Sequence, residues 1–458
     1  MSHFNHRSFQ KEDTIAALAT APGEGAIAVI RISGKEAINI ADRIFSGNVH
    51  SYKSHTVHFG HILEESGTIL DSVLLIVMRA PRSYTGEETI EIHCHGGSIV
   101  SRRVLARILQ AGARAAQPGE FSLQAFMNGK LDLAQAEAVQ QLIAAKNELA
   151  LQAAEQQLQG ALSEKIRSFQ QELTSVAAIL EAWVDFPEEG LEFTSLDEII
   201  KDLEASCQKM TTLRDSFYEG KTVHEGLSLC LLGSPNVGKS SMMNALLGKQ
   251  RAIVTDIAGT TRDLLEDHLT LSGLHFRLID TAGIRETDEI IEQEGIRRSK
   301  LAMQEADIIL LILDASRKLA ENDKKLLQEA PKNKTIVIWN KIDLGPPQDT
   351  IDWESTVHTS AHTKIGFEEL RSAIDQMIWK KGAPNKEEIM ITQQRHFQAL
   401  DHAIKAFQTV IEGLQSGVSP EFISSDLRHG LNELGTIIGS NVTEEILTAI
   451  FSKFCLGK

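Results

Sequence analysis

The sequence predicts an α+β N-terminal domain, then an α-helical bundle domain into which an α/β domain is inserted. Three observations lead to this prediction. Up to about residue 121, β-branched apolar runs alternate with helical spacing, and from about residue 131 to 182 the chain is rich in Ala, Leu, Gln and Glu and nearly free of glycine. Between about residues 227 and 378, short apolar runs alternate with helix-like segments. Helical spacing returns after residue 391, so the α/β part interrupts one helical domain.

The N-terminal domain is expected over residues 1–122, with a helix-like segment at 98–111 and strand-like runs at 26–32, 73–77 and 89–93. The helical domain is expected in two parts, 123–222 and 381–458, with the sequence DFPEEG at 185–190 breaking the first part. The inserted domain is expected over 223–380. Its strand-like runs indicate a mostly parallel, doubly wound sheet and lie at 227–232, 276–280, 308–314 and 335–339.

The composition argues against several classes of protein, including basic RNA-binding proteins, membrane proteins and disulfide-rich secreted proteins. Lys and Arg total 46 against 62 for Asp and Glu, a net charge of −16, so contact with RNA would need a local basic patch or a partner. Aromatic residues are only 5% of the chain, which argues against stacking platforms for single strands. No apolar run approaches the roughly 18 residues of a membrane span, the N-terminus is too polar for a signal peptide, and four cysteines do not form a disulfide framework. We therefore expect a cytoplasmic protein without a membrane segment.

A phosphate-binding loop is predicted at residues 233–240, where GSPNVGKS matches the pattern GxxxxGK followed by Ser or Thr. A strand-like run precedes it and a helix-like segment follows, which is the context that the motif requires. The glycines let backbone N–H groups wrap phosphates at a helix N-terminus. Lys239 would contact the β- and γ-phosphates, and the Ser240 hydroxyl would bind Mg²⁺.

Three further motifs follow in order. In DTAG at 280–283, Asp280 can hold Mg²⁺ through water and the Gly283 N–H can sense a γ-phosphate. In NKID at 340–343, the Asp343 carboxylate can accept two hydrogen bonds from guanine, and adenine offers no such donor pair. TSA at 359–361 would complete the loop beside the base. Together the four motifs resemble the GTPase family, which implies a Ras-like P-loop GTPase domain. The candidate GTP-binding residues are Gly233, Asn236, Val237, Gly238, Lys239, Ser240, Ser241, Thr255, Thr260, Thr261, Asp280, Thr281, Ala282, Gly283, Asn340, Lys341, Asp343, Ser360 and Ala361.

The machinery for hydrolysis departs from that of many small GTPases. TDIAGTTRD at 255–263 occupies the position of a first switch loop, where Thr261 could complete the Mg²⁺ shell. Ile284 follows DTAG where Gln commonly orients the attacking water, so Glu292 is our candidate for that role. No arginine finger can be assigned from spacing, and a monovalent cation could replace it if Asn236 offers its amide oxygen. The candidate catalytic residues are Glu292, Lys239 and Thr261.

Several strings outside the GTPase motifs carry a more specific resemblance. They are ATAPGEGAIAVIRISG near the start, SYTGEETIEIHCHGG at 83–97, PGEFSLQAFMNGKLDLAQAEA at 118–138, DFPEE at 185–189 and FCLGK at the end. With GSPNVGKSS, TDIAGTTRD and DTAGIRET, they make nearly the whole chain similar to the tRNA-modifying GTPase family called MnmE, or TrmE.

The resemblance implies a homodimer whose N-terminal domains pair and bind a tetrahydrofolate derivative, 5,10-methylene- or 5-formyl-tetrahydrofolate. The folate would donate one carbon to C5 of the wobble uridine (U34) of certain tRNAs, giving an aminomethyl or carboxymethylaminomethyl group. A flavoprotein partner, MnmG or GidA, would carry FAD, use NADH and form a heterotetramer or a larger assembly. No Rossmann GxGxxG is present here, which fits the need for that second protein.

The same resemblance assigns ligand positions. Ser240 and Thr261 would hold Mg²⁺, and Glu292 would orient the water. Potassium would be surrounded by Asn236, Thr255, Ile257 through its backbone carbonyl, and Thr260. The folate positions would be Arg31, Glu91, Lys130 and Lys458. A carboxylate suits the amino-pyrimidine edge of a pterin, but each of these four residues could instead be an ordinary surface charge.

Two other features leave alternatives open. Cys455 could be a nucleophile or could pack a helix end, and packing is favoured. His93 and His95 should lie on one face of a strand and Cys94 on the other, so no metal site is assigned there. For the whole chain, the alternatives are a ribosome-assembly or RNA-binding GTPase scaffold without one-carbon chemistry, and a signalling switch without chemistry of its own.

Overall fold

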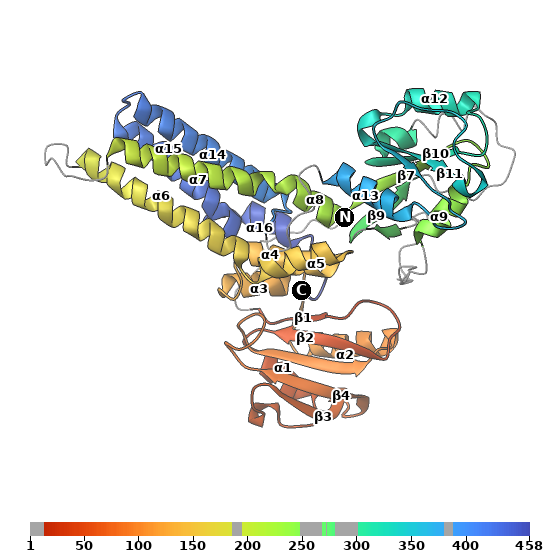
Figure 1. Cartoon of the computed structure of the whole chain (residues 1–458). Coiled ribbons are helices and arrows are strands. Elements are labelled where there is room, and N and C mark those ends of the chain that lie inside the picture. Colours follow the sequence, from red (N-terminus) through yellow and green to blue (C-terminus); the bar gives the residue numbers. More distant parts are fainter. Residues whose placement is uncertain (1–12, 186–194, 248–267, 272, 280–300, 380–387) are drawn as a thin grey trace. The chain divides into compact units, whose positions relative to one another are not determined.

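The structure, a computed structural model, describes residues 13–185, 195–247, 268–271, 273–279, 301–379 and 388–458 (Figure 1). The chain divides into two compact units. Unit 1 comprises Met1–Ala144, Ala154–Thr212 and Arg395–Lys458, and unit 2 comprises Ala145–Ala153 and Leu213–Gln394. Unit 1 holds the N-terminal sheet and the long helices, and unit 2 holds the second sheet. No helix among the described residues combines the length and apolar character needed to cross a membrane.

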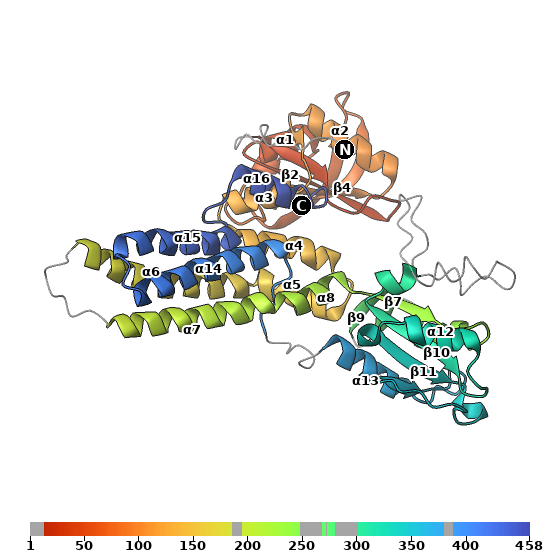
Figure 2. The ribbon, with the colours of Figure 1, turned by 90° about the horizontal axis from the view of Figure 1, so that it is seen from above.

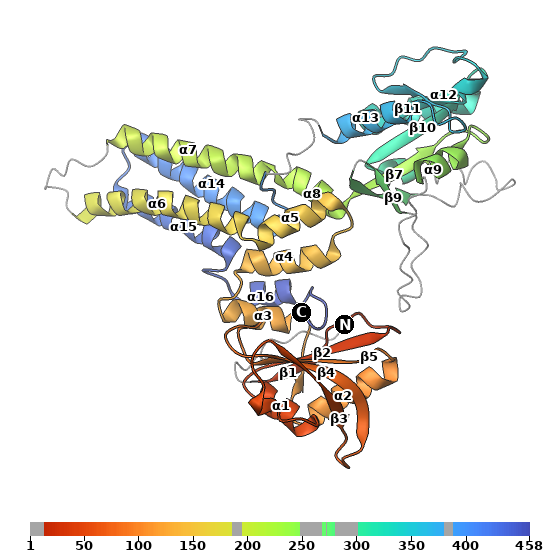
Figure 3. The ribbon, with the colours of Figure 1, turned by 60° about the horizontal axis from the view of Figure 1, so that its bottom comes forward.

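The N-terminal sheet has the strand order β3-β4-β5-β2-β1-β6. Its strands are β1 (Ile15–Leu18), β2 (Ile27–Ser33), β3 (Thr56–Leu63), β4 (Ile69–Met78), β5 (Thr89–His95) and β6 (Arg114–Ala115). Alternation along the strands sends Ile30, Leu75 and Ile92 to one face, where they pack in one core with α1 (Ala37–Ile44) and α2 (Ser98–Gln110). Figure 3 shows these two helices against the sheet. The opposite face of β3, β4 and β5 therefore has no helix of this core on it.

The helical part of unit 1 is built around a bundle. Figures 1 and 2 show four long helices running side by side: α6 (Ala161–Asp185), α7 (Leu196–Asp215), α14 (Gln394–Gln415) and α15 (Pro420–Ile438). Shorter helices complete it: α3 (Glu120–Met127), α4 (Leu133–Ala144), the end of α5 (Glu148–Leu158) and α16 (Glu444–Phe451). Gly430 lets α15 approach α14 closely, because a Cβ there would lie 2.6 Å from the Phe407 ring.

A buried ion cluster fastens the first turn of α14. The Arg395 guanidinium pairs with the Glu137 carboxylate of α4 at 2.7 Å, and His396 Nε2 lies 2.8 Å from the same carboxylate. Arg395 also donates to the carbonyl of Ile437, at the end of α15. Arg395 is where the chain returns from unit 2, so three helices are joined at the point of return.

Unit 2 contains a sheet with the order β12-β11-β10-β7-β9-β8, in which only β8 runs antiparallel to its neighbour. Its elements are α8 (Phe217–Glu225), β7 (Leu227–Leu232), α9 (Lys239–Leu247), β8 (His268–Leu271), β9 (Leu274–Ile279), β10 (Ile308–Asp314), α12 (Glu321–Glu329), β11 (Thr335–Asn340), η4 (Ile342–Leu344), β12 (Thr356–His358) and α13 (Phe367–Ile378). Because β7, β10 and β11 are parallel neighbours, the loops after them meet at one edge of the sheet.

Part of α5 belongs to this second unit. Ala150 lies in the same apolar core as Val223 and Phe276, with Leu149 packed against it. Asn147 Nδ2 donates to the Val223 carbonyl at 2.8 Å. The chain therefore crosses between the two units four times, after residues 144, 153, 212 and 394.

The predicted fold class is confirmed: an α+β N-terminal domain, a helical bundle and an inserted α/β domain with the sheet order of Ras-like P-loop proteins. The runs at 227–232 and 308–314 coincide with β7 and β10. The sequence missed the short or polar elements β1, β3, β6, β8, β12 and α1.

Candidate functional site: a phosphate-binding loop and an N-terminal charged cluster

The loop between β7 and α9 has the backbone of a phosphate-binding loop. Gly233, Asn236 and Gly238 adopt φ values of 152°, 64° and 97°, which favour glycine at the two outer positions. A Cβ on Gly233 would lie 2.4 Å from the Ile312 carbonyl oxygen, and one on Gly238 would lie 2.4 Å from Asn340 Nδ2. A side chain at Gly233 would displace the β10 backbone and one at Gly238 would displace the Asn340 amide, so the two glycines set the close packing of the site.

Lys239 closes the loop on itself. Its Nζ donates to the carbonyl oxygens of Gly233 at 2.8 Å and Ser234 at 3.0 Å. Burial lowers the pKa of the Lys239 amine, and the negative charge of Asp323 opposes that shift. A cation held within a turn of backbone N–H groups at a helix N-terminus is suited to a bound phosphate.

Asn340 and Lys341 connect the end of β11 to the P-loop. The buried Asn340 donates from Nδ2 to the Val237 carbonyl at 2.9 Å and accepts the Ala361 N–H at 3.0 Å. Lys341 Nζ lies 2.7 Å from the Asn236 carbonyl oxygen and 2.7 Å from the Asp314 carboxylate. Three loops that are far apart in sequence are thus joined by two side chains.

The remaining residues on the predicted base side differ in exposure. Ser360 is buried, and its hydroxyl accepts the Thr363 N–H at 3.1 Å, so it shapes the loop. Asp343, in η4, is exposed, and its carboxylate pairs with no residue that the structure describes. A guanine base could therefore reach Asp343 directly, whereas Asn340 and Ser360 hold the surrounding backbone.

Much of the predicted hydrolytic machinery lies outside the described residues, so its roles stay predictions. This group comprises Thr255, Ile257, Thr260, Thr261, Asp280, Thr281, Ala282, Gly283 and Glu292. Of the predicted cation ligands, the structure describes Asn236 in the P-loop and Ser240 in the first turn of α9, both exposed.

A second cluster lies in unit 1, where Arg31 and Glu91 occupy paired positions on β2 and β5. Arg31 Nε donates to Glu91 Oε1 at 2.9 Å, and Arg31 Nη1 donates to the Gly457 carbonyl at 3.3 Å. The guanidinium also faces the rings of Tyr84 at 5.4 Å and Phe121 at 5.6 Å. The C-terminal residues are therefore folded against the sheet beside an ion pair and two aromatic rings.

The two predicted lysines lie near the loop that carries Tyr84. Lys458 Nζ is 5.6 Å from the centre of the Tyr84 ring, so this lysine joins the Arg31 cluster. Burial lowers the pKa of Lys458, and the charge of Arg31 lowers it further. Lys130 donates to the Pro81 carbonyl at 3.2 Å and packs beside Gly86, at the two ends of that loop.

The residues for which the sequence left alternatives open can be placed. Cys455 is exposed, so the favoured view that it packs a helix end is wrong; the neighbouring Phe454 packs there instead. Cys94 is buried on the helix-covered face of the sheet, away from His93 and His95. No group of three or more His, Cys, Asp or Glu side chains among the described residues is arranged to hold a metal ion.

Sequence reasoning missed several residues that build these sites. Asp314, the last residue of β10, holds Lys341, and its acidic side chain at the end of an apolar strand was a signal for it. Tyr84 and Phe121 both lie within family-like strings but neither was singled out. Only the fold shows that both rings face Arg31.

The chain matches known proteins over nearly its whole length. Residues 14–130 match the family "GTP-binding protein TrmE N-terminus", and residues 133–455 match the family "MnmE helical domain". A "tRNA modification GTPase MnmE" of Protochlamydia amoebophila is 59% identical over 99% of this chain and 100% of its own length. The protein of that name from Alkaliphilus oremlandii is 41% identical over 98% and 99%. The solved G domain of the T. maritima FeoB iron transporter is 29% identical over 33% of this chain and 98% of that chain, with a TM-score of 0.25. By the two family matches and by the length and identity of the two relatives named tRNA modification GTPase MnmE, the chain belongs to the MnmE (TrmE) family of tRNA modification GTPases.

Proposed function

We propose that this protein hydrolyses GTP and, with a flavoprotein partner (MnmG or GidA), adds an aminomethyl or carboxymethylaminomethyl group to C5 of U34 in certain tRNAs. A tetrahydrofolate derivative would supply the carbon. The observation that carries this proposal is the pairing, in one chain, of a P-loop with a separate charged and aromatic cluster around Arg31. The relatives' name, tRNA modification GTPase, supports the choice of substrate. Because that substrate is tRNA, the proposed activity belongs to the cytoplasm.

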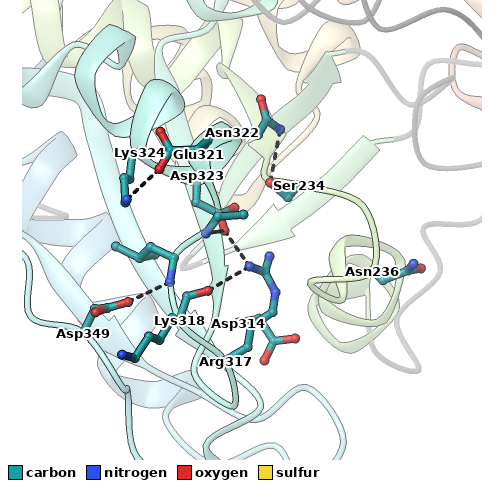
Figure 4. A network of polar contacts seen from close by, with 12 residues as sticks. Ser234, Asn236, Asp314, Arg317, Lys318, Glu321, Asn322, Asp323, Lys324 and Asp349 are labelled. Atoms are coloured by element: carbon teal, nitrogen blue, oxygen red, sulfur yellow. Dashed lines mark hydrogen bonds and ion pairs between the residues drawn. The ribbon is translucent and has the colours of Figure 1, made fainter.

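In the nucleotide site, Lys239 would contact the β- and γ-phosphates, and Asp343 would accept the hydrogen bonds of guanine. Ser240 and Thr261 would hold Mg²⁺, which supplies positive charge to the phosphates. Asn236 would be a K⁺ ligand with Thr255, Thr260 and the Ile257 carbonyl. Lys341 binds the carbonyl of Asn236, and Figure 4 shows the Asn236 side chain directed away from the network on α12, so its amide is not used there. Glu292 would orient the attacking water, and loss of the γ-phosphate would release the switch loops.

The charges and the aromatic ring of the N-terminal cluster support a folate as its ligand. The side chains of Arg31 and Lys458 bring two positive charges against the single negative charge of Glu91, which favours an anionic ligand. Glu91 Oε2 is 3.8 Å from His93 Nε2, beyond hydrogen-bond distance, so this oxygen can accept from an amino-pyrimidine. The Tyr84 ring adds an apolar surface for a flat ligand. Lys130 would approach from the other end of the same loop.

The open face of the N-terminal sheet supports a homodimer. Phe59 is 72% exposed, Val57 56% and Leu74 44%, and strand pairing places all three on the face opposite α1 and α2. Contiguous apolar side chains exposed on a sheet face usually mark an interface. A second copy of this chain would cover the patch. The Arg31–Glu91 pair lies on the same face of the neighbouring strands, so the folate site would border the dimer interface.

The deciding experiment is a calorimetric titration of the full chain with 5-formyl-tetrahydrofolate, a stable relative of the reactive donor. We expect saturable binding that is lost in Arg31→Ala and Glu91→Ala and kept in Arg103→Ala, which removes an exposed arginine of α2 from the same domain. No binding by the folded wild-type protein would refute the one-carbon role. GTP hydrolysis and ribosome co-sedimentation without folate binding would point to the RNA-binding GTPase instead.

A further inference from the structure

The first turn of α12 contacts the P-loop. Asn322 Nδ2 donates to Ser234 Oγ at 3.1 Å, and Figure 4 shows this contact at the edge of a polar network on α12. Ser234 is only 5% exposed, so its hydroxyl is largely removed from water. The contact therefore links a helix that has no assigned role to the second residue of the P-loop.

Ser234 has a second contact that gives the first one its importance. Its carbonyl oxygen accepts a hydrogen bond from Lys239 Nζ at 3.0 Å. One residue is thus held by α12 through its hydroxyl and holds the phosphate-contacting lysine through its carbonyl. A shift of Ser234 would move one of the two oxygens that fix the Lys239 ammonium.

The turn that carries Asn322 is itself firmly held. Asp323, 1% exposed, accepts the Ala320 N–H at 3.0 Å and pairs with Arg317 at 2.9 Å, both through Oδ2. The Ala320 side chain cannot accept a hydrogen bond. The bond from the Ala320 N–H to the Asp323 carboxylate is therefore the only side-chain cap that these two residues can give the N-terminus of α12. The preceding Leu319 N–H is bound by Asp349 at 2.7 Å. Asn322 therefore projects from a turn fixed on both sides, as Figure 4 shows.

We propose that Asn322 is a positioning residue for GTP hydrolysis, holding Ser234 so that Lys239 is aimed at the phosphates, and that Asp323 supports it by fixing the first turn of α12. The inference rests on the GTPase activity proposed above. An interaction that aligns a preorganised charge acts mainly in the transition state, where charge on the phosphates shifts. The polar, charged sequence ENDKKLLQE gives no hint of such a role.

The test is a double-mutant cycle in the full chain, with steady-state GTPase kinetics measured beside thermal unfolding. Asn322→Ala removes the donor, Ser234→Ala removes the acceptor, and a third protein carries both changes. Gln328→Ala is the matched control, because it removes an amide from the same helix at an exposed position. We expect each single variant to lose about three- to tenfold in kcat, the range for one hydrogen bond, with a smaller change in KM. The double variant should match the singles, and the unfolding midpoint of the Asn322 variant should stay at the wild-type value.

Other outcomes overturn the inference. If Asn322→Ala has the same kcat for GTP as Gln328→Ala, Asn322 has no role in the mechanism. Losses that multiply in the double variant would show that the two side chains act independently. A lowered unfolding midpoint with unchanged kcat would assign Asn322 to stability alone. If the wild-type protein hydrolyses no GTP under the same conditions, the proposed function fails rather than this inference.

Discussion

Asn340 offers a sharp prediction, because its position in a nucleotide motif suggests a ligand contact but its hydrogen bonds are to the protein. Asn340→Ala removes the donor to the Val237 carbonyl and the acceptor for the Ala361 N–H. Each loss leaves a polar backbone group without its partner. The Asn340 side chain is only 1% exposed, so both groups lie where water has little access. Each unpaired group costs about 1–3 kcal/mol, and water that enters the space left by the side chain would reduce this cost. We therefore expect a loss of about 2–4 kcal/mol in the free energy of unfolding.

Intrinsic fluorescence during urea unfolding would measure this loss without nucleotide. Unit 2 contains Trp339, Trp353 and Trp379, and only Trp183 lies in unit 1, so the signal reports mainly on the unit that holds Asn340. With a urea slope of about 2 kcal/mol per molar, the transition should move down by about 1–2 M. Because a chain of two units need not unfold in one step, the transition of unit 2 is the one to compare.

The matched control is Asp343→Asn, three residues further along and exposed. It should leave the unfolding transition of the nucleotide-free protein where it is. An unchanged transition in Asn340→Ala, accompanied by weakened GTP binding, would refute the reasoning, because Asn340 would then act on the nucleotide and not on the loops.

Three further predictions concern single carboxylates: those of Asp343, Glu292 and Glu137. Asp343→Asn should weaken GTP binding at least tenfold because the guanine pairing is lost, and equal affinity by fluorescence titration would contradict the base-reading role. Glu292→Ala should keep GTP affinity but lower single-turnover hydrolysis at least tenfold because the water is no longer oriented, and an unchanged rate would exclude it. Burial alone would raise the pKa of Glu137, but His396 and Arg395 together lower it to about 2. The ionised carboxylate therefore stabilises unit 1 above pH 4.5, its ordinary pKa, and we expect about 3 kcal/mol to be lost as pH falls from 4.5 to about 2. Glu137→Gln should flatten that acid dependence in unfolding experiments, and an unchanged slope would show that this pair is not its source.

The sequence predicted best where a local pattern determines the structure. The apolar run that became β10 is buried along its whole length and the run that became β7 is buried after Leu227, so their limits could be read from hydropathy. β3 was missed because His58, Gly60 and His61 interrupt its apolar pattern. β12 was missed because it has only three residues, and its pairing with β11 defines it more than its composition does.

The same holds for the candidate sites: residues within one short motif were predicted, and residues brought in from distant segments were not. Gly233, Gly238 and Lys239 belong to one short string, and they lie where the string predicts, on one loop. Asn322 reaches that loop from α12, 88 residues away from Ser234, and nothing in the sequence around Asn322 indicates this contact. Arg31 and Lys458 could be connected in advance only through the family resemblance, because 426 residues separate Arg31 from the neighbouring Gly457.

Because α5 is divided between the two units, the inserted domain cannot simply be exchanged between related proteins. A domain inserted through two junctions can be exchanged between relatives by replacing one continuous segment, whereas this chain passes between its units after residues 144, 153, 212 and 394. A transplant of residues 223–380 alone would leave Leu149 and Ala150 behind, and the new domain would have to match an apolar surface inherited from its host. The inserted domain and the first part of α5 must therefore change together, and chimeras that carry residues 145–153 along with the G domain should fold where simpler exchanges fail.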